Sequence, residues 1–546
     1  MRSKLTQNGR LYLTWFRFLI IVLLVMGVFF RFVNLDHKAY WYDETATSLR
    51  ISGYTWSELN HQLLEHVVRI EDLQNYQRIN PDKGVINTIK SLAVEEPQHP
   101  PLYFVIERFW VQWLGNSVAV RRSLSALISL FVFPCLYWLC LELFKSSLVG
   151  WVAIALIAVS PFHVLYAQEA REYSLWTVTI LLSSAALLRA MRLKTKLSWG
   201  IYAATVALGL YTYLFSGLVA IGHGIYVVIT ESFRLTKTLT AYLLASLAGI
   251  IAFAPWIFVV ITNLSEIRGT THWTLSYTPL LALVEMWIVN LSRIFIDFNY
   301  GFSSKMLWLE LVILILIGYS MYFLCRKTPK QVWLFVLTLI GPTLILALPD
   351  LIGKGELTTI TRYLIPCYLG IQLAVAYLFT TQITSISVTL RQKKLWQIAI
   401  LLLTLSGVLS CAVSSQQVWW WNKYSAIFNP QVARIVNEAS YPLFITNDSG
   451  VAQTLAYLFA PKVRIQVVAD KQLVMPNGEL RCQPNMFNTP DGFSDIFLYT
   501  FDFKSKLNKK QNCKIELVHE WEQEYQPAYK SKASLWKLQQ RLVRAF

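Results

Sequence analysis

Charged residues are scarce in this chain of 546 residues, because only 15% are Asp, Glu, Lys or Arg, whereas soluble domains usually carry about 25%. This scarcity excludes an ordinary water-soluble enzyme and a disordered protein. Acidic residues are fewer than basic ones: the chain has 32 Asp and Glu and 49 Lys and Arg, which gives a formal net charge of +17. In a soluble protein that charge would favour nucleic-acid binding. Here basic loops on the cytoplasmic face of a membrane explain it better, and we expect no nucleic-acid partner.

Cysteine is also rare, and the seven present show no spacing typical of a metal cluster. Five of them lie in or beside apolar runs, where we expect inert core residues. The other two, Cys482 and Cys513, lie in a polar C-terminal region. They could form a disulfide if that region is extracytoplasmic.

Hydrophobic residues, in contrast, make up 55% of the chain, and they form runs of about 20 that can cross a membrane as helices. The first run, 11–32, follows Arg2, Lys4 and Arg10 and exceeds a signal peptide, so we interpret it as a retained anchor. The segment 278–304 is either an extra span or, as we expect from its charged residues, interfacial. Ten further spans are predicted at 119–143, 147–166, 173–192, 198–215, 217–231, 239–261, 306–325, 331–348, 364–382 and 395–414.

Lysine and arginine give these eleven spans a direction, because cytoplasmic loops are enriched in both. With the N-terminus in the cytoplasm, nearly all short basic clusters fall on that side. An odd number of spans then places the first loop, 34–118, and the C-terminal region, 415–546, outside. We expect a multi-pass protein of a cell membrane, the inner membrane of a bacterium. The basic clusters are Lys145; Arg189, Arg192, Lys194 and Lys196; Arg234 and Lys237; Arg326, Lys327 and Lys330; and Arg391, Lys393 and Lys394.

The predicted fold is an α-helical polytopic membrane domain over 1–414, followed by a small extracytoplasmic α/β domain over 415–546. The loop 34–118 belongs to the first domain and contains helical stretches at 56–70 and 101–114, the second of which we expect at the membrane surface. The C-terminal domain alternates strand-like runs with a helical stretch. Its predicted strands are 443–446, 463–468, 496–500 and 514–518, and its predicted helix is 451–458.

Ionisable residues just outside membrane depth are natural candidates for a functional site. The motif 40–45 contains Asp43 and Glu44, flanked by aromatic residues, closely after the first span. On a helix these two side chains point about 100° apart. At most one therefore faces a given substrate, while the other orients it or bonds to the backbone. The structural alternative is a solvated start of a loop.

Two more polar clusters fall on the predicted outer face. The motif 95–103 has prolines suited to the first turn of a helix, and its Glu96 and His99 could bind a phosphate or a divalent metal. Its structural alternative is a proline-capped interfacial helix. The turn 166–173 between two spans is unusually polar and contains Arg171. Its structural alternative is hydrogen bonding between helices.

Arg362 and Tyr363 form the fourth cluster, at the outer start of the tenth span. An arginine on this side breaks the bias of basic residues toward the cytoplasm. Its guanidinium is suited to bidentate recognition of phosphate, and a lipid phosphate would lie at this depth. The alternative is a side chain that only reaches out to lipid headgroups.

The chain resembles the GT-C superfamily of membrane glycosyltransferases in these motifs and in their order along the sequence. Within it, the chain resembles bacterial relatives of protein O-mannosyltransferases and of the lipid A aminoarabinose transferase. The resemblance implies multi-span helices, a first extracytoplasmic loop with interfacial helices, and a soluble extracytoplasmic domain. It rests on the segments 35–48, 98–103, 113–121, 166–173 and 361–363, with a further likeness of 443–452 to the periplasmic domain of the aminoarabinose transferases.

The resemblance also implies a donor, namely a sugar carried on a polyprenyl phosphate. Asp43 matches the acidic residue that these enzymes place as catalytic base, with Glu44 beside it. Arg362 and Tyr363 match a region that holds the lipid phosphate. His99 stands where the aminoarabinose transferases carry a phosphate-side lysine. Arg171 is a further candidate to bind the phosphate.

A metal is implied less directly. Gln98 stands where the aminoarabinose transferases carry a metal-binding glutamate, and this departure weakens the case for a metal there. His272 matches their other metal ligand. A divalent ion, magnesium or manganese, is therefore an alternative that the resemblance leaves open.

These residues fit a single displacement that inverts the anomeric carbon. A lipid phosphate is already a good leaving group, so one carboxylate can deprotonate an acceptor hydroxyl as it attacks. Cations can stabilise the charge on the departing phosphate. The acceptor could be a lipid, a protein or a glycan. Three alternatives remain: a ligase for whole lipid-linked glycans, a transporter or flippase, for which inverted repeats would be expected, and a membrane-anchored scaffold protein.

Overall fold

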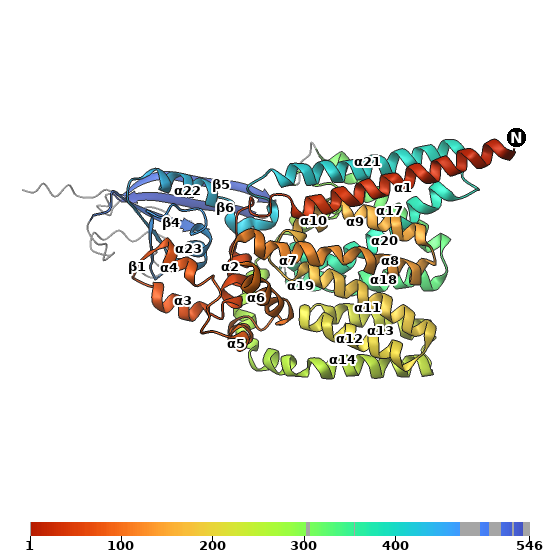
Figure 1. Cartoon of the computed structure of the whole chain (residues 1–546), viewed down its shortest axis with the longest axis horizontal. Coiled ribbons are helices and arrows are strands. Elements are labelled where there is room, and N and C mark those ends of the chain that lie inside the picture. The colour runs from red at the N-terminus through yellow and green to blue at the C-terminus, as the bar shows by residue number, and fades with distance from the viewer. Residues whose placement is uncertain are drawn as a thin grey trace, which may run out of the picture. The chain divides into compact units, whose positions relative to one another are not determined.

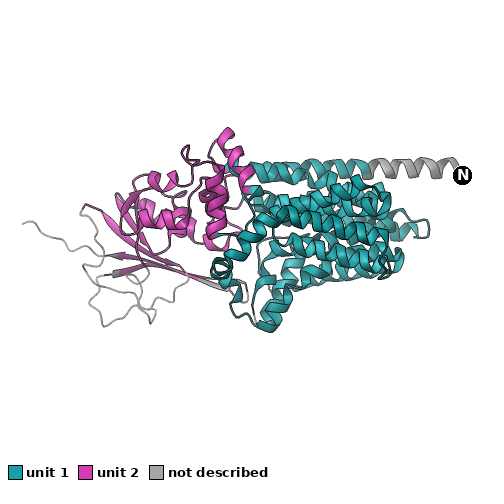
Figure 2. Ribbon diagram, turned by 90° about the horizontal axis from the view of Figure 1, so that it is seen from below, with its two compact units in different colours: residues 1–35, 96–103, 119–416 teal, residues 36–95, 104–118, 417–546 magenta. Residues whose placement is uncertain are grey.

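The chain forms two compact units (Figure 2). Unit 1 is helical, and unit 2 combines helices with a six-stranded sheet. Cys482 and Cys513 fall outside the described residues, so their pairing stays a prediction. Unit 1 comprises residues 1–35, 96–103 and 119–416, and unit 2 comprises 36–95, 104–118 and 417–546. The computed structural model describes residues 2–301, 306–353, 355–469, 492–501, 515–526 and 529–538.

Most helices of unit 1, which Figure 1 labels, cover the predicted spans. Within the described residues, seven helices are long and apolar enough to cross a membrane, or up to nine if each of two bent pairs is one span. The chain is therefore a multi-pass α-helical membrane protein, as predicted, while the count of eleven spans stays a prediction. The main helices are α1 (Arg2–Phe32), α7 (Val118–Leu130), α8 (Val132–Phe144), α9 (Ser147–Ala158), α10 (Pro161–Ala167), α11 (Tyr173–Leu193), α12 (Lys196–Thr212), α13 (Ser216–Thr230), α14 (Lys237–Thr262), α17 (Leu307–Lys327), α18 (Lys330–Leu344), α20 (Ile365–Thr384) and α21 (Leu390–Ser415).

Two helix pairs are sharply bent. Helices α9 and α10 meet at 65° within the predicted span 147–166. Pro161 causes this bend, because it begins α10 and has no N–H with which to continue the hydrogen-bond ladder of α9. The second pair joins Leu264–Leu275 to α16 (Leu280–Ser292) at 94°. The part of the segment 278–304 that forms α16 thus belongs to either a broken span or a re-entrant loop.

Two helices form the centre of unit 1. In its most apolar window α11 is 78% buried, and the segment Thr361–Thr384, which contains α20, is 89% buried. For α14 the corresponding share is only 22%. Helices that are buried on all sides belong to the core of a bundle, whereas exposed apolar helices face lipid. The polar motifs 166–173 and 361–363 lie at the starts of these two central helices, so rigid elements hold them.

Helix α9 packs closely against α1 and α21 because glycine leaves room for its backbone. A Cβ on Gly27 of α1 would collide with the backbone of Ala158, and a Cβ on Gly407 of α21 would lie 2.6 Å from the carbonyl oxygen of Val159. Small residues allow this kind of backbone approach between membrane helices. The first predicted span is thereby part of the bundle.

The sheet of unit 2 has the strand order β1-β3-β2-β4-β6-β5. Strand β2 runs parallel to β3 and β4, and the other pairs are antiparallel. The predicted strands and helix of the C-terminal region are all present, and β6 was not predicted. The strands are β1 (Val67–Arg69), β2 (Pro442–Thr446), β3 (Arg464–Val467), β4 (Asp495–Phe501), β5 (Ile515–Gln526) and β6 (Tyr529–Leu538). The helices around them are α2 (Tyr42–Ile51), α3 (Trp56–Leu63), α4 (Ile70–Asn75), α5 (Val85–Glu95), α6 (Leu102–Leu114), η4 (Trp421–Ala426), α22 (Asn429–Glu438) and α23 (Ser449–Leu455).

The first loop departs from the prediction. A helix over 56–70 is wrong beyond Leu63, because Glu65 has a left-handed φ of 64° and the chain then extends into β1. The β-branched Val67 and Val68 favour a strand here, and β1 pairs with β3 of the C-terminal region. The loop therefore shares a compact unit with that region. The predicted domain boundary after residue 414 stays a prediction.

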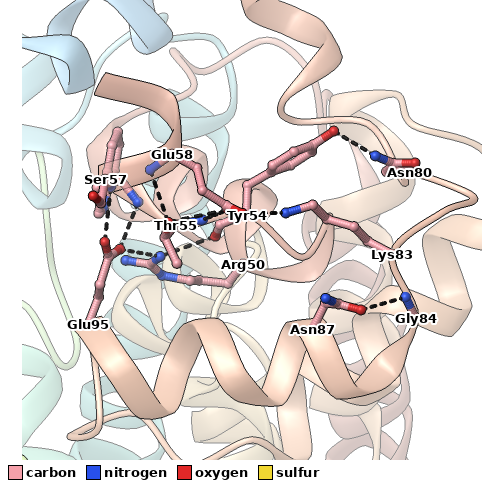
Figure 3. Close-up of polar contacts among 11 residues, drawn as sticks. Arg50, Tyr54, Thr55, Ser57, Glu58, Asn80, Lys83, Gly84, Asn87 and Glu95 are labelled. Carbon is pink, nitrogen blue, oxygen red and sulfur yellow. Dashed lines mark hydrogen bonds and ion pairs between the residues drawn. The ribbon is translucent and has the colours of Figure 1, made fainter. Parts of the chain in front are cut away.

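Glu95 fastens the helices of this loop together (Figure 3). Its carboxylate accepts the backbone N–H groups of Trp56 and Ser57 at 2.7 and 3.0 Å, and Nη1 of Arg50 at 2.6 Å. It thus satisfies donors at the start of α3, which have no partner within the helix, and ties α5 to α2. The first carboxylate of the motif 95–103 is therefore structural.

Candidate functional site

Two buried arginines of unit 1 meet at Tyr173. The guanidinium carbon of Arg171 lies 5.8 Å from the centroid of the Tyr173 ring, and that of Arg362 lies 5.6 Å from it. Arg362 is also 5.5 Å from the ring of Tyr363. The arginines are only 3% and 6% exposed. An aromatic face attracts a cation most strongly where water is excluded, so Tyr173 helps to hold two positive charges close together.

His99 joins the same group through Arg171 and Glu172. Its Nδ1 lies 2.9 Å from Oε1 of Glu172. Nη2 of Arg171 lies 3.3 Å from His99 Nε2 and 3.3 Å from the same Oε1. A carboxylate can only accept, so the Nδ1–H of His99 and the guanidinium of Arg171 both donate to Glu172. We call this group the cation cluster, and it consists of His99, Arg171, Tyr173, Arg362 and Tyr363.

Glu172 is the carboxylate that contacts both His99 and Arg171. It is fully buried, and burial alone would raise the pKa of its carboxyl. The positive charge of Arg171 and the interaction with His99 outweigh burial and lower the pKa of Glu172 to about 2. The carboxylate is therefore ionised at neutral pH and orients both partners.

The cation cluster is built where the two central helices begin. Glu172 immediately precedes α11, and the short helix η3 (Thr361–Leu364) leads into α20. The hydroxyls of Tyr166 and Thr361 are 2.8 Å apart and join the two segments. Helix N-termini carry partial positive charge, so both helix starts add to the field of the arginines.

The sequence interpretation missed Tyr213, which follows α12 in an extended conformation. Its ring centroid lies 6.1 Å from that of Tyr173, 6.3 Å from that of Tyr363 and 6.4 Å from that of His99. Tyr213 thus links three members of the cation cluster. The available signal was a tyrosine near the outer end of a predicted span, where aromatic residues are enriched.

The end of α1 is bound to the turn that carries Arg171. The side-chain amide of Gln168 donates to the carbonyl oxygens of Phe30 and Val33 at 2.9 and 2.8 Å. Arg122 donates to the carbonyl oxygen of Leu35 at 2.7 Å. Within unit 1 the chain therefore leaves α1 beside this turn, shortly before the motif 40–45.

The two acidic residues of that motif lie in unit 2 and differ sharply. Both fall in the first turn of α2, where a negative charge is favourable. Asp43 is half-buried, whereas Glu44 is 0% exposed. A carboxylate oxygen of Glu44 lies 2.6 Å from Nζ of Lys423. The two side chains thus face different surroundings, as expected from their angle on a helix.

Lys423 is a residue that sequence interpretation missed. It lies in η4, and its Nζ is 5.7 Å from the ring centroid of Trp41. Nε1 of Trp419 donates to its backbone carbonyl oxygen at 2.8 Å. The lysine is 1% exposed, and a buried ammonium is tolerated only when it is paired. The run of tryptophans around it was the one signal of burial.

The residues proposed for a metal do not form a ligand set. His272 begins the short helix η1 (His272–Leu275), and its side chain is exposed. Throughout the described part of the chain, no group of three or more His, Cys, Asp or Glu side chains could hold a metal ion. His99 is engaged with Arg171 and Glu172 instead. We derive no chemical step through a metal, and the metal stays a prediction.

The structure thus brings His99, Arg171, Arg362 and Tyr363 together, as expected for residues that serve one ligand. The described contacts do not include one between His272 and these four. Asp43 and Glu44 belong to unit 2.

The chain was compared with protein families, curated proteins and solved structures. Among curated proteins none matches the chain. Two crystal structures of ArnT from Cupriavidus metallidurans, one bound to undecaprenyl phosphate and one in the apo state, are similar at 11% identity, with TM-scores of 0.49 and 0.47. Each comparison covers 96% of this chain and 98% of that chain. Residues 98–258, which include His99, Arg171 and Glu172, match the family described as dolichyl-phosphate-mannose-protein mannosyltransferase. This family match confirms the predicted resemblance to the membrane glycosyltransferases related to protein O-mannosyltransferases.

Proposed function

We propose that the chain is an integral-membrane glycosyltransferase that moves a sugar from a polyprenyl phosphate to an acceptor hydroxyl on the extracytoplasmic face. The observation that carries this proposal is the pair of buried arginines, Arg171 and Arg362, over the ring of Tyr173 at the start of the two central helices. The family match over 98–258 supports the class of reaction.

The cation cluster suits a phosphate that is attached to a lipid. Guanidinium groups bind phosphate oxygens with paired hydrogen bonds, and their burial strengthens each charge interaction. The cluster sits at the ends of helices that are apolar enough to span a membrane, where we expect a lipid phosphate. A polyprenyl tail could remain in the bilayer while its phosphate enters between the helix ends.

The reaction that we propose is a single displacement. The acceptor oxygen forms a bond with the anomeric carbon while the bond from that carbon to the phosphate oxygen breaks. The bonding electrons leave with the polyprenyl phosphate, whose charge the arginines stabilise. The proton of the acceptor hydroxyl passes to a carboxylate. The configuration of the anomeric carbon is inverted.

Asp43 is the carboxylate that we propose as the base. It is half-buried in the first turn of α2 and remains accessible to an acceptor. Glu44, by contrast, is fully buried against Lys423. Because the carboxylate of Glu44 is buried and engaged by Nζ of Lys423, we assign Glu44 a positioning role rather than proton transfer.

His99 acts in this proposal as a positioning residue. Its ring contacts both Glu172 and Arg171. It thereby orients Arg171 toward the donor. Tyr363 and Tyr213 enclose the arginines in an aromatic wall that limits access of water.

A membrane assay tests the proposal directly. Membranes that contain the full chain are supplied with several radiolabelled polyprenyl-phosphate sugars, and the labelled product is isolated and identified. We expect label from one of these donors in a lipid, protein or glycan, and none from a nucleotide sugar used as the control donor. Transfer of a whole saccharide from a lipid pyrophosphate would instead identify a glycan ligase. Movement of labelled lipid across the bilayer without transfer would identify a flippase.

A further inference from the structure

A groove of about 480 Å³ opens between α12 and α14, at the end of the bundle where the basic loops lie. This volume is in the range of ligand sites in proteins, roughly 300–1,000 Å³. Three lysines line it, namely Lys194, Lys196 and Lys237, together with Trp199. The groove belongs entirely to unit 1.

The walls of the groove are made of small residues. Gly200 lies on α12, and Ala241 and Ala245 lie on α14. The two helices approach closely at one end, where a Cβ on Gly249 would lie 3.0 Å from the carbonyl oxygen of Ala203. A Cβ on Gly200 would meet nothing within 4 Å. The helices thus diverge from Gly249 toward the lysines and leave an apolar trough between them.

The lysines at the mouth are available to a ligand. All three are exposed, and none makes an ion pair or a side-chain hydrogen bond with the residues that the structure describes. The acidic Glu142 is already engaged by Arg192 at 2.7 Å and by Lys145 at 3.6 Å. The mouth of the groove is therefore positively charged above an apolar trough.

The groove is distinct from the cation cluster. Tyr173 is the first residue of α11, and Lys194 directly follows its last. A helix of this length spans roughly 30 Å, which is about the thickness of the hydrocarbon core. The two sites therefore lie near opposite faces of the bilayer, so one polyprenyl phosphate headgroup cannot occupy both.

We propose that this groove binds an anionic phospholipid of the leaflet on the side of the basic loops. The headgroup phosphate lies among the three lysines, and one acyl chain lies in the trough along Gly200 and Ala245. Anionic lipids are attracted to basic pockets between membrane helices, and tryptophan favours the interface where the headgroup meets the acyl chain. The charge of the mouth and the apolar trough together select a charged lipid over a zwitterionic one.

Native mass spectrometry of the purified full chain tests this proposal, with phosphatidylglycerol and phosphatidylcholine as the probes. The variant Lys194→Ser/Lys196→Ser/Lys237→Ser should lose affinity for phosphatidylglycerol by about a hundredfold, since each lysine near an anionic lipid adds several-fold. The matched control is Arg326→Ser/Lys327→Ser/Lys330→Ser. It removes three exposed charges from a predicted cytoplasmic loop that does not line the groove, and should retain the lipid.

Gly200→Leu gives an independent test, because it fills the trough without changing any charge and replaces glycine by a better helix former. It should displace phosphatidylglycerol as the triple variant does. Equal loss in both triple variants would show general charge attraction and overturn the proposal. Equal retention of phosphatidylcholine and phosphatidylglycerol by the wild type would overturn it as well. So would tighter binding of undecaprenyl phosphate than of phosphatidylglycerol at the groove, which would assign the groove to the donor.

Discussion

The carboxylate of Glu44 lies 2.6 Å from Nζ of Lys423, and these side chains are 0% and 1% exposed within unit 2. This ion pair joins α2 of the first loop to η4, which follows the last membrane helix. The ion pair also makes two neighbouring carboxylates differ: Glu44 is fully buried, whereas Asp43 is only half-buried. Glu44 thus fixes the segment, whereas Asp43 is the residue for which we propose a chemical role.

Glu44→Gln should destabilise the protein, because it leaves the ammonium of Lys423 buried without a counter-charge. Breaking a buried ion pair costs about 3 kcal/mol or more, which a thermal unfolding scan of the purified protein would detect. The double variant Glu44→Gln/Lys423→Met should recover much of this loss. As a control, Glu58→Gln removes a partly exposed pair with Lys83 and should cost at most about 1 kcal/mol. A Glu44→Gln variant as stable as the control would contradict a structural role for the pair.

The first loop and the C-terminal region should lie on the same, extracytoplasmic side of the membrane. Strand β1 of the loop pairs with β3 of the C-terminal region, so the two segments fold as one sheet. The outward direction follows from the basic loops on the other side. Reporter fusions after residues 70 and 450 should therefore both give an extracytoplasmic signal. A cytoplasmic signal from either fusion would contradict the prediction of eleven spans.

Arg362→Ala should weaken binding of the polyprenyl-phosphate donor while the protein still folds. A hydrogen bond to a charged group contributes about 1.5–3 kcal/mol, so the dissociation constant should rise roughly 10- to 100-fold. The measurement is binding of a labelled polyprenyl phosphate to the purified protein. Arg268→Ala removes an exposed arginine of unit 1 outside the cation cluster and serves as the control. Unchanged affinity in the Arg362 variant would remove that residue from the donor site.

Glu172 should make stability depend on pH in acid. The pKa of its carboxyl is lowered from 4.5 to about 2 in the folded protein. Its stabilising effect is therefore complete above about pH 4.5 and is lost as the pH falls toward 2, with a total of about 3 kcal/mol. Thermal unfolding of the wild type and of Glu172→Gln should be compared across this range. The two stability curves should converge as the pH falls, and a constant difference between them would contradict the assignment.

The membrane helices could be predicted from sequence because each one depends on a local property, an apolar run of sufficient length. The same holds for the strands of the C-terminal region, whose alternation is visible within a few residues. Strand β1 could not be predicted in this way. Its three residues are too few for a period of two, and it exists only because it pairs with β3, far along the chain.

The candidate site, too, could be predicted from sequence only where it depends on local patterns. Arg171, Arg362 and His99 stood out because polar residues on short outer turns are unusual beside so much lipid. Their convergence on Tyr173 and the pairing of Glu44 with Lys423 depend on contacts between distant segments. The tryptophans around Lys423 indicate burial, but no local pattern identifies Glu44 as its partner, so this pairing becomes visible only in the folded chain.

We expect Asp43 to remove the proton of the acceptor hydroxyl during sugar transfer. A base acts mainly in the transition state, and its loss typically lowers the rate by ~10²–10⁴-fold. Asp43→Asn keeps the shape of the side chain and removes its basicity. Asp36→Asn changes an exposed aspartate of the same loop and serves as the matched control.

The most direct measurement is the rate of sugar transfer from a radiolabelled polyprenyl phosphate, together with donor affinity, for the wild type and these two variants. We predict that Asp43→Asn lowers kcat by at least about a hundredfold with nearly unchanged donor affinity, while Asp36→Asn behaves as the wild type. Transfer by Asp43→Asn at the wild-type rate would contradict the account and place the base elsewhere.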